Sequence, residues 1–231
     1  MKTFLKAGLM VALLTGVMGL AVTSAKADAL LPGTTIAGPS TTLFFGGVLL
    51  ASATNTFNNG ALAGTARVAV YSGGAGTCAG CLDFYYQFTN TGAALVNDSV
   101  SRTSNFNFGL GGITTNVFQI TNGNLVGAGW LPGTILSLTA DRSADGSTVG
   151  QSFGTSASSL FVPGTSNLAF VIRTNATNFT TGNYAVIDGV SQNNPAFSPV
   201  SPVVVPEPAS MLLLGTGLVG LAGAFRRRFN K

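Results

Sequence analysis

The sequence predicts an all-β protein: an antiparallel β-sandwich or jelly-roll-like single domain, with an N-terminal signal peptide and one C-terminal transmembrane helix. Three observations support this prediction. Only 8% of the 231 residues are charged and 31 are glycine, which is typical of turn-rich β proteins and not of helical bundles. Apolar residues in the middle of the chain alternate with polar ones at a period of two, without helical periodicity. Each end of the chain carries an uncharged apolar run.

The first expected element is a secretory signal peptide over residues 1–27. Two lysines open it, residues 7–22 are apolar, and Ala25 and Ala27 are the small residues that signal peptidase recognises. We therefore expect cleavage after Ala27. The alternative is an uncleaved anchor helix at the same place.

The body is expected over residues 28–191 and to consist of short strands. In residues 82–88, four apolar side chains alternate with Asp83, Tyr85 and Gln87, which places the apolar set on one face. Strands are expected at 42–52, 65–72, 82–88, 113–121, 134–140, 148–153, 168–173 and 184–189. Glycine-containing turn signals separate them, as in an antiparallel sandwich or jelly roll.

The body's charge excludes one class of partner. The formal charge of the whole chain is +4, but residues 28–205 contain four arginines and six aspartates, a net charge of −2. Nucleic-acid binding depends on clustered cations that neutralise phosphates. We therefore expect no nucleic-acid partner.

Cys78 and Cys81 are the only cysteines of the chain, and the chain contains no histidine. A four-ligand Cys/His zinc site cannot be completed with two ligands. A thioredoxin-like centre would place Cys81 on a helix, whereas the residues that follow it predict a strand. The pair therefore predicts a disulfide across a turn, whose loop closure contributes about 2 kcal/mol to stability.

A weak metal-site candidate follows further along the chain, at Asp141, Ser143 and Asp145. Oxygens at alternate positions before a glycine are what a calcium loop provides, but the position of the closing acid holds Ser152. Asp145-Gly146 also predicts a hairpin turn, which is the favoured interpretation. No cofactor is expected.

Catalysis has little support in this composition. Without histidine, a Ser-His-Asp or Cys-His arrangement is impossible, and the scattered aspartates suggest no carboxylate pair for glycoside hydrolysis. We therefore expect no enzyme activity. Tyr85, Tyr86 or Trp130 could stack on sugar rings if they were exposed. Threonine is abundant, but its positions follow no fixed repeat.

The last part of the chain resembles a stop signal for export. Residues 192–205 are rich in proline, serine and asparagine and predict a semi-extended linker. Ala209 to Phe225 is an uncharged run of about 25 Å as a helix, and Arg226, Arg227 and Arg228 after it are expected to stay cytoplasmic. Two prolines around Glu207 keep the preceding backbone extended and accessible.

These features together resemble the PEP-CTERM sorting signal of Gram-negative bacteria, over residues 206–231. The resemblance rests on the residues Val205, Pro206, Glu207, Pro208 and Ala209, on the apolar run, and on the three arginines. It implies transient anchoring in the inner membrane and recognition by an exosortase. It also implies removal of the helix near Pro-Glu-Pro and delivery to the cell surface or outside. An ordinary C-terminal anchor helix is the alternative.

Cys81 to Asn90 and Leu168 to Gly189 are also similar to bodies found ahead of this tail, which implies an exported β domain. The expected function is that of a non-enzymatic surface or extracellular-matrix protein, associated with exopolysaccharide or biofilm. The alternative is a carbohydrate-binding or ice-binding β-module that carries the same tail.

Overall fold

The computed structural model describes residues 27–44, 46–60, 62–74, 78–92, 102–109, 111–121, 125, 127–156 and 160–200. The predicted signal peptide up to residue 26 and the segment from residue 201 onward, which includes the predicted transmembrane helix, lie outside them. The described residues form thirteen strands: β1 (Asp28–Ala29), β2 (Thr35–Ala37), β3 (Thr41–Thr42), β4 (Val48–Asn58), β5 (Ala63–Ser72), β6 (Leu82–Asn90), β7 (Arg102–Asn105), β8 (Thr115–Ile120), β9 (Thr139–Arg142), β10 (Val149–Ser152), β11 (Ala169–Thr174), β12 (Asn178–Asp188) and β13 (Val190–Val200). None of these residues belongs to a helix that could cross a membrane.

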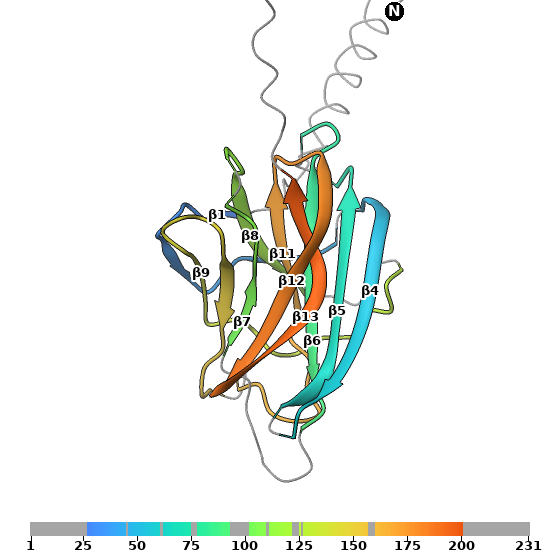
Figure 1. Cartoon of the computed structure of the whole chain (residues 1–231), viewed down its shortest axis with the longest axis vertical. Coiled ribbons are helices and arrows are strands. Elements are labelled where there is room, and N and C mark those ends of the chain that lie inside the picture. The colour runs from blue at the N-terminus through green and yellow to red at the C-terminus, as the bar shows by residue number, and fades with distance from the viewer. Residues whose placement is uncertain are drawn as a thin grey trace, which may run out of the picture. The chain divides into compact units, whose positions relative to one another are not determined.

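The strands are arranged in two sheets (Figure 1). The first has the order β1-β8-β11-β6-β5-β4, with β3 also pairing with β8, and the second has the order β13-β12-β7-β10-β9-β2. All strand pairs are antiparallel except β3 with β8. The predicted all-β class with antiparallel sheets is confirmed for this part of the chain.

The main core lies between the two sheets. Apolar side chains of β5, β6, β8 and β11 pack against those of β9, β10, β12 and β13 in one buried cluster. The rings of Tyr86 on β6 and Tyr184 on β12 stack with centroids 5.4 Å apart. The Tyr86 hydroxyl also donates a hydrogen bond of 2.7 Å to the Phe197 carbonyl on β13. Two sheets that share one core in this way make the body sandwich-like.

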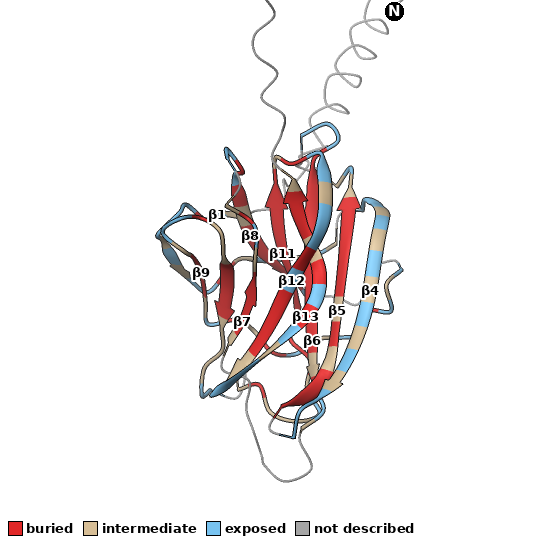
Figure 2. Cartoon of the chain, viewed as in Figure 1, coloured by how far each residue is buried: buried red, intermediate tan, exposed pale blue. Residues whose placement is uncertain are grey.

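A second apolar cluster covers the other face of the first sheet. Tyr71, Tyr85 and Trp130 belong to it, and the Trp130 indole N–H donates to the Tyr71 hydroxyl at 2.9 Å. Strands β5, β6 and β11 are therefore buried on both faces, as Figure 2 shows. The polar side chains of Asp83 and Gln87, which alternate with the apolar residues of β6, are buried as well.

The structure corrects the predicted linker at residues 192–205. Val190–Val200 form β13, which pairs with β12 along its whole length, so the body extends to Val200 and not to residue 191. Pro195 and Pro199 are tolerated because they lie where the backbone points away from β12. The Pro195 carbonyl accepts a hydrogen bond from the Asn55 side chain, and both backbone groups of a residue in an antiparallel strand point to the same side.

The other strands differ from the expectation mainly at their ends. Strands β6, β8, β10 and β11 lie within one or two residues of the predicted ranges. The strand expected at 134–140 is mostly absent, because β9 begins only at Thr139. Strand β4 begins later and continues further than the range 42–52, and β7 lies where no strand is predicted.

Candidate functional site

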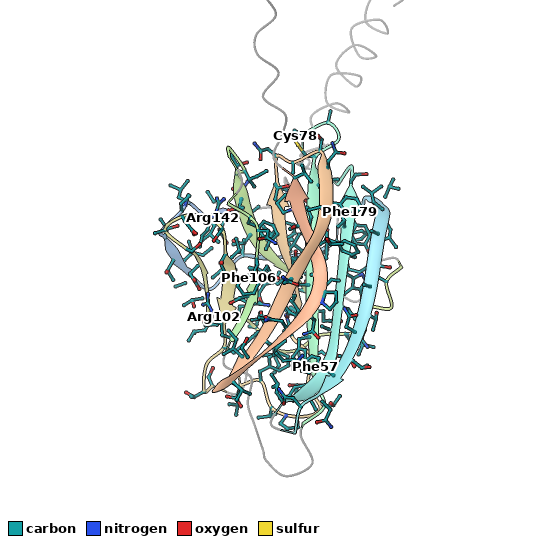
Figure 3. All side chains as sticks on the ribbon, in the orientation of Figure 1. Phe57, Cys78, Arg102, Phe106, Arg142 and Phe179 are labelled. Atoms are coloured by element: carbon teal, nitrogen blue, oxygen red, sulfur yellow. A yellow bond between two sulfur atoms is a disulfide. The ribbon has the colours of Figure 1, made fainter. Side chains whose placement is uncertain are left out.

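The two cysteines lie in the turn that leads into β6, at the position labelled in Figure 3. Cys78 and Cys81 are joined as a disulfide, with their Cα atoms 5.1 Å apart. The Cys81 backbone N–H donates to the Cys78 carbonyl at 3.0 Å, which closes the turn. Cys81 is fully buried beside the core, whereas Cys78 is exposed. This geometry fastens the start of a buried strand.

Asp145 lies in the hairpin turn between β9 and β10, as the Asp-Gly pattern predicts. Its carboxylate accepts hydrogen bonds from the Ser143 hydroxyl and from the Ser147 backbone N–H and hydroxyl. These bonds lower the pKa of Asp145 to about 2, and Gly146 adopts a φ of +76° to complete the turn. The carboxylate and the hydroxyl that were candidate calcium ligands therefore bond to each other.

Asp141, the third candidate ligand, is held by an arginine of another strand. Arg102 of β7 makes a two-pronged contact with Asp141 of β9, with one N···O distance of 2.5 Å and the other of 2.8 Å. Its side chain crosses over Gly150 of the strand between them, where a Cβ atom would overlap the guanidinium group. Arg102 also donates to the hydroxyls of Ser104 and Ser152. No group of three potential metal ligands occurs among the described residues.

A second ion pair is buried on the face of the first sheet that the second apolar cluster covers. Arg173 of β11 donates to the Asp83 carboxylate of β6 at 2.9 Å, and its guanidinium carbon lies 5.0 Å from the centre of the Phe118 ring. Burial raises the pKa of Asp83, and the hydrogen bond and charge of Arg173 oppose this rise. Because both side chains are buried, this pair ties two neighbouring strands together and is closed to a substrate.

Arg142 is the labelled arginine at the end of β9 in Figure 3, and it has no carboxylate partner among its hydrogen bonds. Its guanidinium donates to backbone carbonyls of four separate segments, at Leu30, Phe108, Ile113 and Gly146. Burial lowers the pKa of Arg142. The side chain therefore links these four segments to β9. The carbonyl dipoles stabilise its positive charge in place of water.

The surface feature that the sequence did not reveal is a row of hydroxyls across the first sheet. Register places Thr56 of β4 opposite Thr65 of β5, and Thr65 opposite Thr89 of β6. Ser166 extends this hydroxyl row through a bridge to Thr89, with 2.8 Å between the two hydroxyl oxygens. Arg67, one position further along the same face, donates to the Thr89 hydroxyl at 2.9 Å.

The hydroxyl row is partly open to solvent. Thr56 is exposed, Thr65 and Thr89 are half-buried, and Ser166 is buried. Neighbouring strands are about 4.8 Å apart, so the row presents evenly spaced polar groups. The three aromatic residues considered for sugar stacking do not join it, because Tyr85, Tyr86 and Trp130 are all buried. That part of the carbohydrate-binding hypothesis is wrong.

The remaining predicted site residues lie outside the described residues: Ala25, the motif Val205 to Ala209, and Arg226 to Arg228. Ala27, the last residue before the expected cleavage point, is described and packs against the second apolar cluster.

Comparison with known families assigns the end of the chain. Residues 204–228 match the model of the PEP-CTERM protein-sorting motif. The chain therefore carries a sorting signal of exosortase substrates, which implies export and membrane-associated sorting. No curated protein and no solved structure matches the chain. The match covers the tail and says nothing of what the body binds.

Proposed function

We propose that this protein is a non-enzymatic component of the cell surface or extracellular polysaccharide matrix of a Gram-negative bacterium. It is delivered there after signal peptidase removes residues 1–27 and an exosortase removes the tail near Pro206-Glu207-Pro208. The single observation that carries this proposal is the match of residues 204–228 to the PEP-CTERM protein-sorting motif. In this proposal the body is the mature protein and the tail is the sorting signal that directs its export.

The state of four of the body's six aspartates supports a non-enzymatic body. Acid–base catalysis by two carboxylates needs side chains that can reach a substrate and exchange a proton. Asp28, Asp83, Asp141 and Asp145 are each engaged by partners of the same chain: Ser40, Arg173, Arg102, and the Ser143 and Ser147 hydroxyls, respectively. Asp83 is also buried. A body of this kind suits a structural role better than a catalytic one.

The processing step is tested by the intact mass of the protein from cells with and without exosortase. With the enzyme, we expect loss of residues 1–27 and of the segment after the Pro-Glu-Pro motif. Without it, the tail should remain. Pro206→Ala should block processing, whereas Pro202→Ala, outside the motif, serves as the matched control. An intact tail in both strains would contradict the proposal and leave an ordinary membrane anchor.

A second candidate function is carbohydrate binding through the hydroxyl row, because a partly open, evenly spaced set of hydroxyls can hydrogen-bond to a polysaccharide. The test is a glycan array probed with the exported protein. Thr56→Val keeps the side-chain shape but removes a hydroxyl, and should weaken any selective binding. Thr180→Val, at an exposed position of β12, is the matched control. Ice-growth inhibition measured on the same proteins tests the ice-binding alternative.

A further inference from the structure

The edges of the two sheets differ in how well they are protected. An edge strand presents unpaired backbone N–H and C=O groups, which makes it a template for another strand. Strands β1 and β3 at one edge of the first sheet have two residues each, and β2 at one edge of the second sheet has three. Strands this short offer little to a partner. Among the strands of the described residues, only β13 and β4, with eleven residues each, form long edges.

The edge of β13 is closed by the chain itself. Pro195 and Pro199 lack the N–H groups that would point outward from this strand. The outward carbonyls of Pro195 and Phe197 accept hydrogen bonds from the Asn55 side chain at 3.0 Å and from the Tyr86 hydroxyl at 2.7 Å. An added strand could therefore not form a regular ladder with β13, because outward N–H groups are missing and outward carbonyls are already hydrogen-bonded.

The edge of β4 has none of these protections. Val48–Asn58 contain no charged residue and no proline. In the part of the chain that the structure describes, the backbone hydrogen bonds of β4 run to β5 alone. Its residues alternate between exposed and half-buried along the whole strand, in contrast to the buried β5 beside it (Figure 2). Val48 and Leu50 are 64% and 46% exposed.

We propose that the β4 edge pairs antiparallel with β4 of a second copy of this chain, across a twofold axis. An antiparallel edge is complementary to itself, and the absence of charge removes the repulsion that normally prevents such self-pairing. Because the axis is perpendicular to the sheets, both copies present the hydroxyl row on the same side. The pairing closes after two copies, since each chain offers one edge of this kind within the described residues.

The irregularity in β4 indicates the register. The pairing of β4 with β5 shifts between Leu49 and Ala51, so that regular strand runs from Ala51 to Asn58. In an antiparallel pair, directly opposite residues lie on the same face of the sheet. When both strands are β4, this condition requires the twofold axis to pass beside one residue, and maximal pairing of residues 51–58 places that residue near their middle. Thr54 and Thr56 are the two middle residues of the exposed face of this stretch, and we place the axis at Thr54 because it lies nearer the middle of the whole strand. In the proposed dimer, Thr54 lies opposite its own counterpart.

The register makes a crosslinking test possible with the full chain in cells. The described residues contain no free cysteine, and the two cysteines of the chain are paired with each other. Thr54→Cys therefore introduces the only free thiol and should give a disulfide-linked dimer on a non-reducing gel. Thr180→Cys, at an exposed position of β12, is the control. We expect at least about tenfold more dimer from Thr54→Cys, because paired residues in a ladder meet the distance that a disulfide requires.

A charge at the same position tests the pairing without a covalent link. Thr54 lies opposite Arg67 within the monomer, so Thr54→Glu adds an attractive cross-strand pair there. In the dimer the two glutamates face each other and repel. We expect light scattering to show a dimer for the exported wild-type protein and for Thr180→Glu, and a folded monomer for Thr54→Glu. Mixing Thr54→Glu with Thr54→Lys should restore a mixed dimer.

A monomeric wild-type protein, or equal crosslinking of Thr54→Cys and Thr180→Cys, would overturn the proposal. The crosslinking test does not depend on the proposed function, because it is made on the full chain whether or not the tail is removed. Failure of tail processing would therefore be seen in the intact mass alone and would leave the crosslinking result unchanged.

Discussion

All four tyrosines of the chain are buried, so we predict that alkaline pH unfolds the body in one cooperative step. Burial raises the pKa of Tyr85, Tyr86 and Tyr184 well above the ordinary value of 10. Burial also raises the pKa of Tyr71, although the hydrogen bond from Trp130 to its hydroxyl opposes this rise. The folded state therefore keeps its phenols protonated in a pH range where the unfolded chain loses its phenolic protons.

The sign of the effect follows from proton linkage. Above pH ~10 the unfolded state binds fewer protons than the folded state, so the free energy of unfolding falls as pH rises, and below that pH it is unaffected by these groups. Each buried tyrosine lowers it by about 1.4 kcal/mol per pH unit. Three such tyrosines therefore remove about 8 kcal/mol by pH ~12, compared with a total of roughly 5–15 kcal/mol for a domain.

The assay follows tyrosinate absorbance and the far-ultraviolet circular dichroism of the sheets in one pH titration. We expect both signals to change together, above pH ~11, with no tyrosinate absorbance while the sheets are intact. Tyr184→Phe should make the transition less steep, because one titrating group is lost. Tyrosinate absorbance that rises near pH ~10 with intact sheets would refute the reasoning, since the phenols would then be open to solvent.

Three further predictions concern stability, measured by urea denaturation. Gly150→Ala should lower the free energy of unfolding by about 1–3 kcal/mol, because the added methyl group displaces the Arg102 guanidinium that crosses this glycine. The loss should be smaller in an Arg102→Met background, where no guanidinium is displaced. Arg142→Met should lower the free energy of unfolding by about 3 kcal/mol or more, since it leaves buried carbonyls unpaired, while Arg102→Met at a partly exposed pair should lower it by about 1 kcal/mol. Replacing Cys78 and Cys81 by serine should cost about 2 kcal/mol, and a reductant should have the same effect on the wild type but none on the variant.

The strands that sequence reasoning found are those that bury apolar side chains at a period of two. Strand β6 and strand β11 form the centre of the core, and their patterns predict them almost to the residue. Strand β7 was missed because its four residues, Arg102–Asn105, include no apolar side chain. It is nevertheless buried, since Thr103 and Asn105 face the core between two neighbouring strands. Its place is determined by partners distant in the sequence.

Proline explains the error at the C-terminal strand. A proline-rich stretch predicts a linker when the direction of each backbone N–H is unknown. In β13 the spacing of Pro195 and Pro199 keeps both on the outward side, so the ladder with β12 loses no donor. Only the structure reveals this direction, because it depends on which neighbour the strand pairs with.

The candidate site was only partly predictable. The sorting motif could be recognised because its residues are contiguous. The hydroxyl row could not, because Thr56, Thr65 and Thr89 share no repeat along the chain and align only through register. The Asn59-Gly60 turn is the one local sequence feature that indicates part of this alignment, because it joins β4 to β5 and so sets their register. The partner of Asp83 is equally remote, because Arg173 lies 90 residues away.

The position of β13 at the end of the body governs when the protein can finish folding. This strand meets residues far back in the chain: the Asn55 side chain bonds to a residue 140 positions later, and the Tyr86 hydroxyl to one 111 positions later. The apolar faces of the earlier strands can therefore be fully covered only after these last residues have been synthesised. The body can therefore complete its fold only once the residues up to Val200 are available, a requirement compatible with a chain that carries an export and sorting signal.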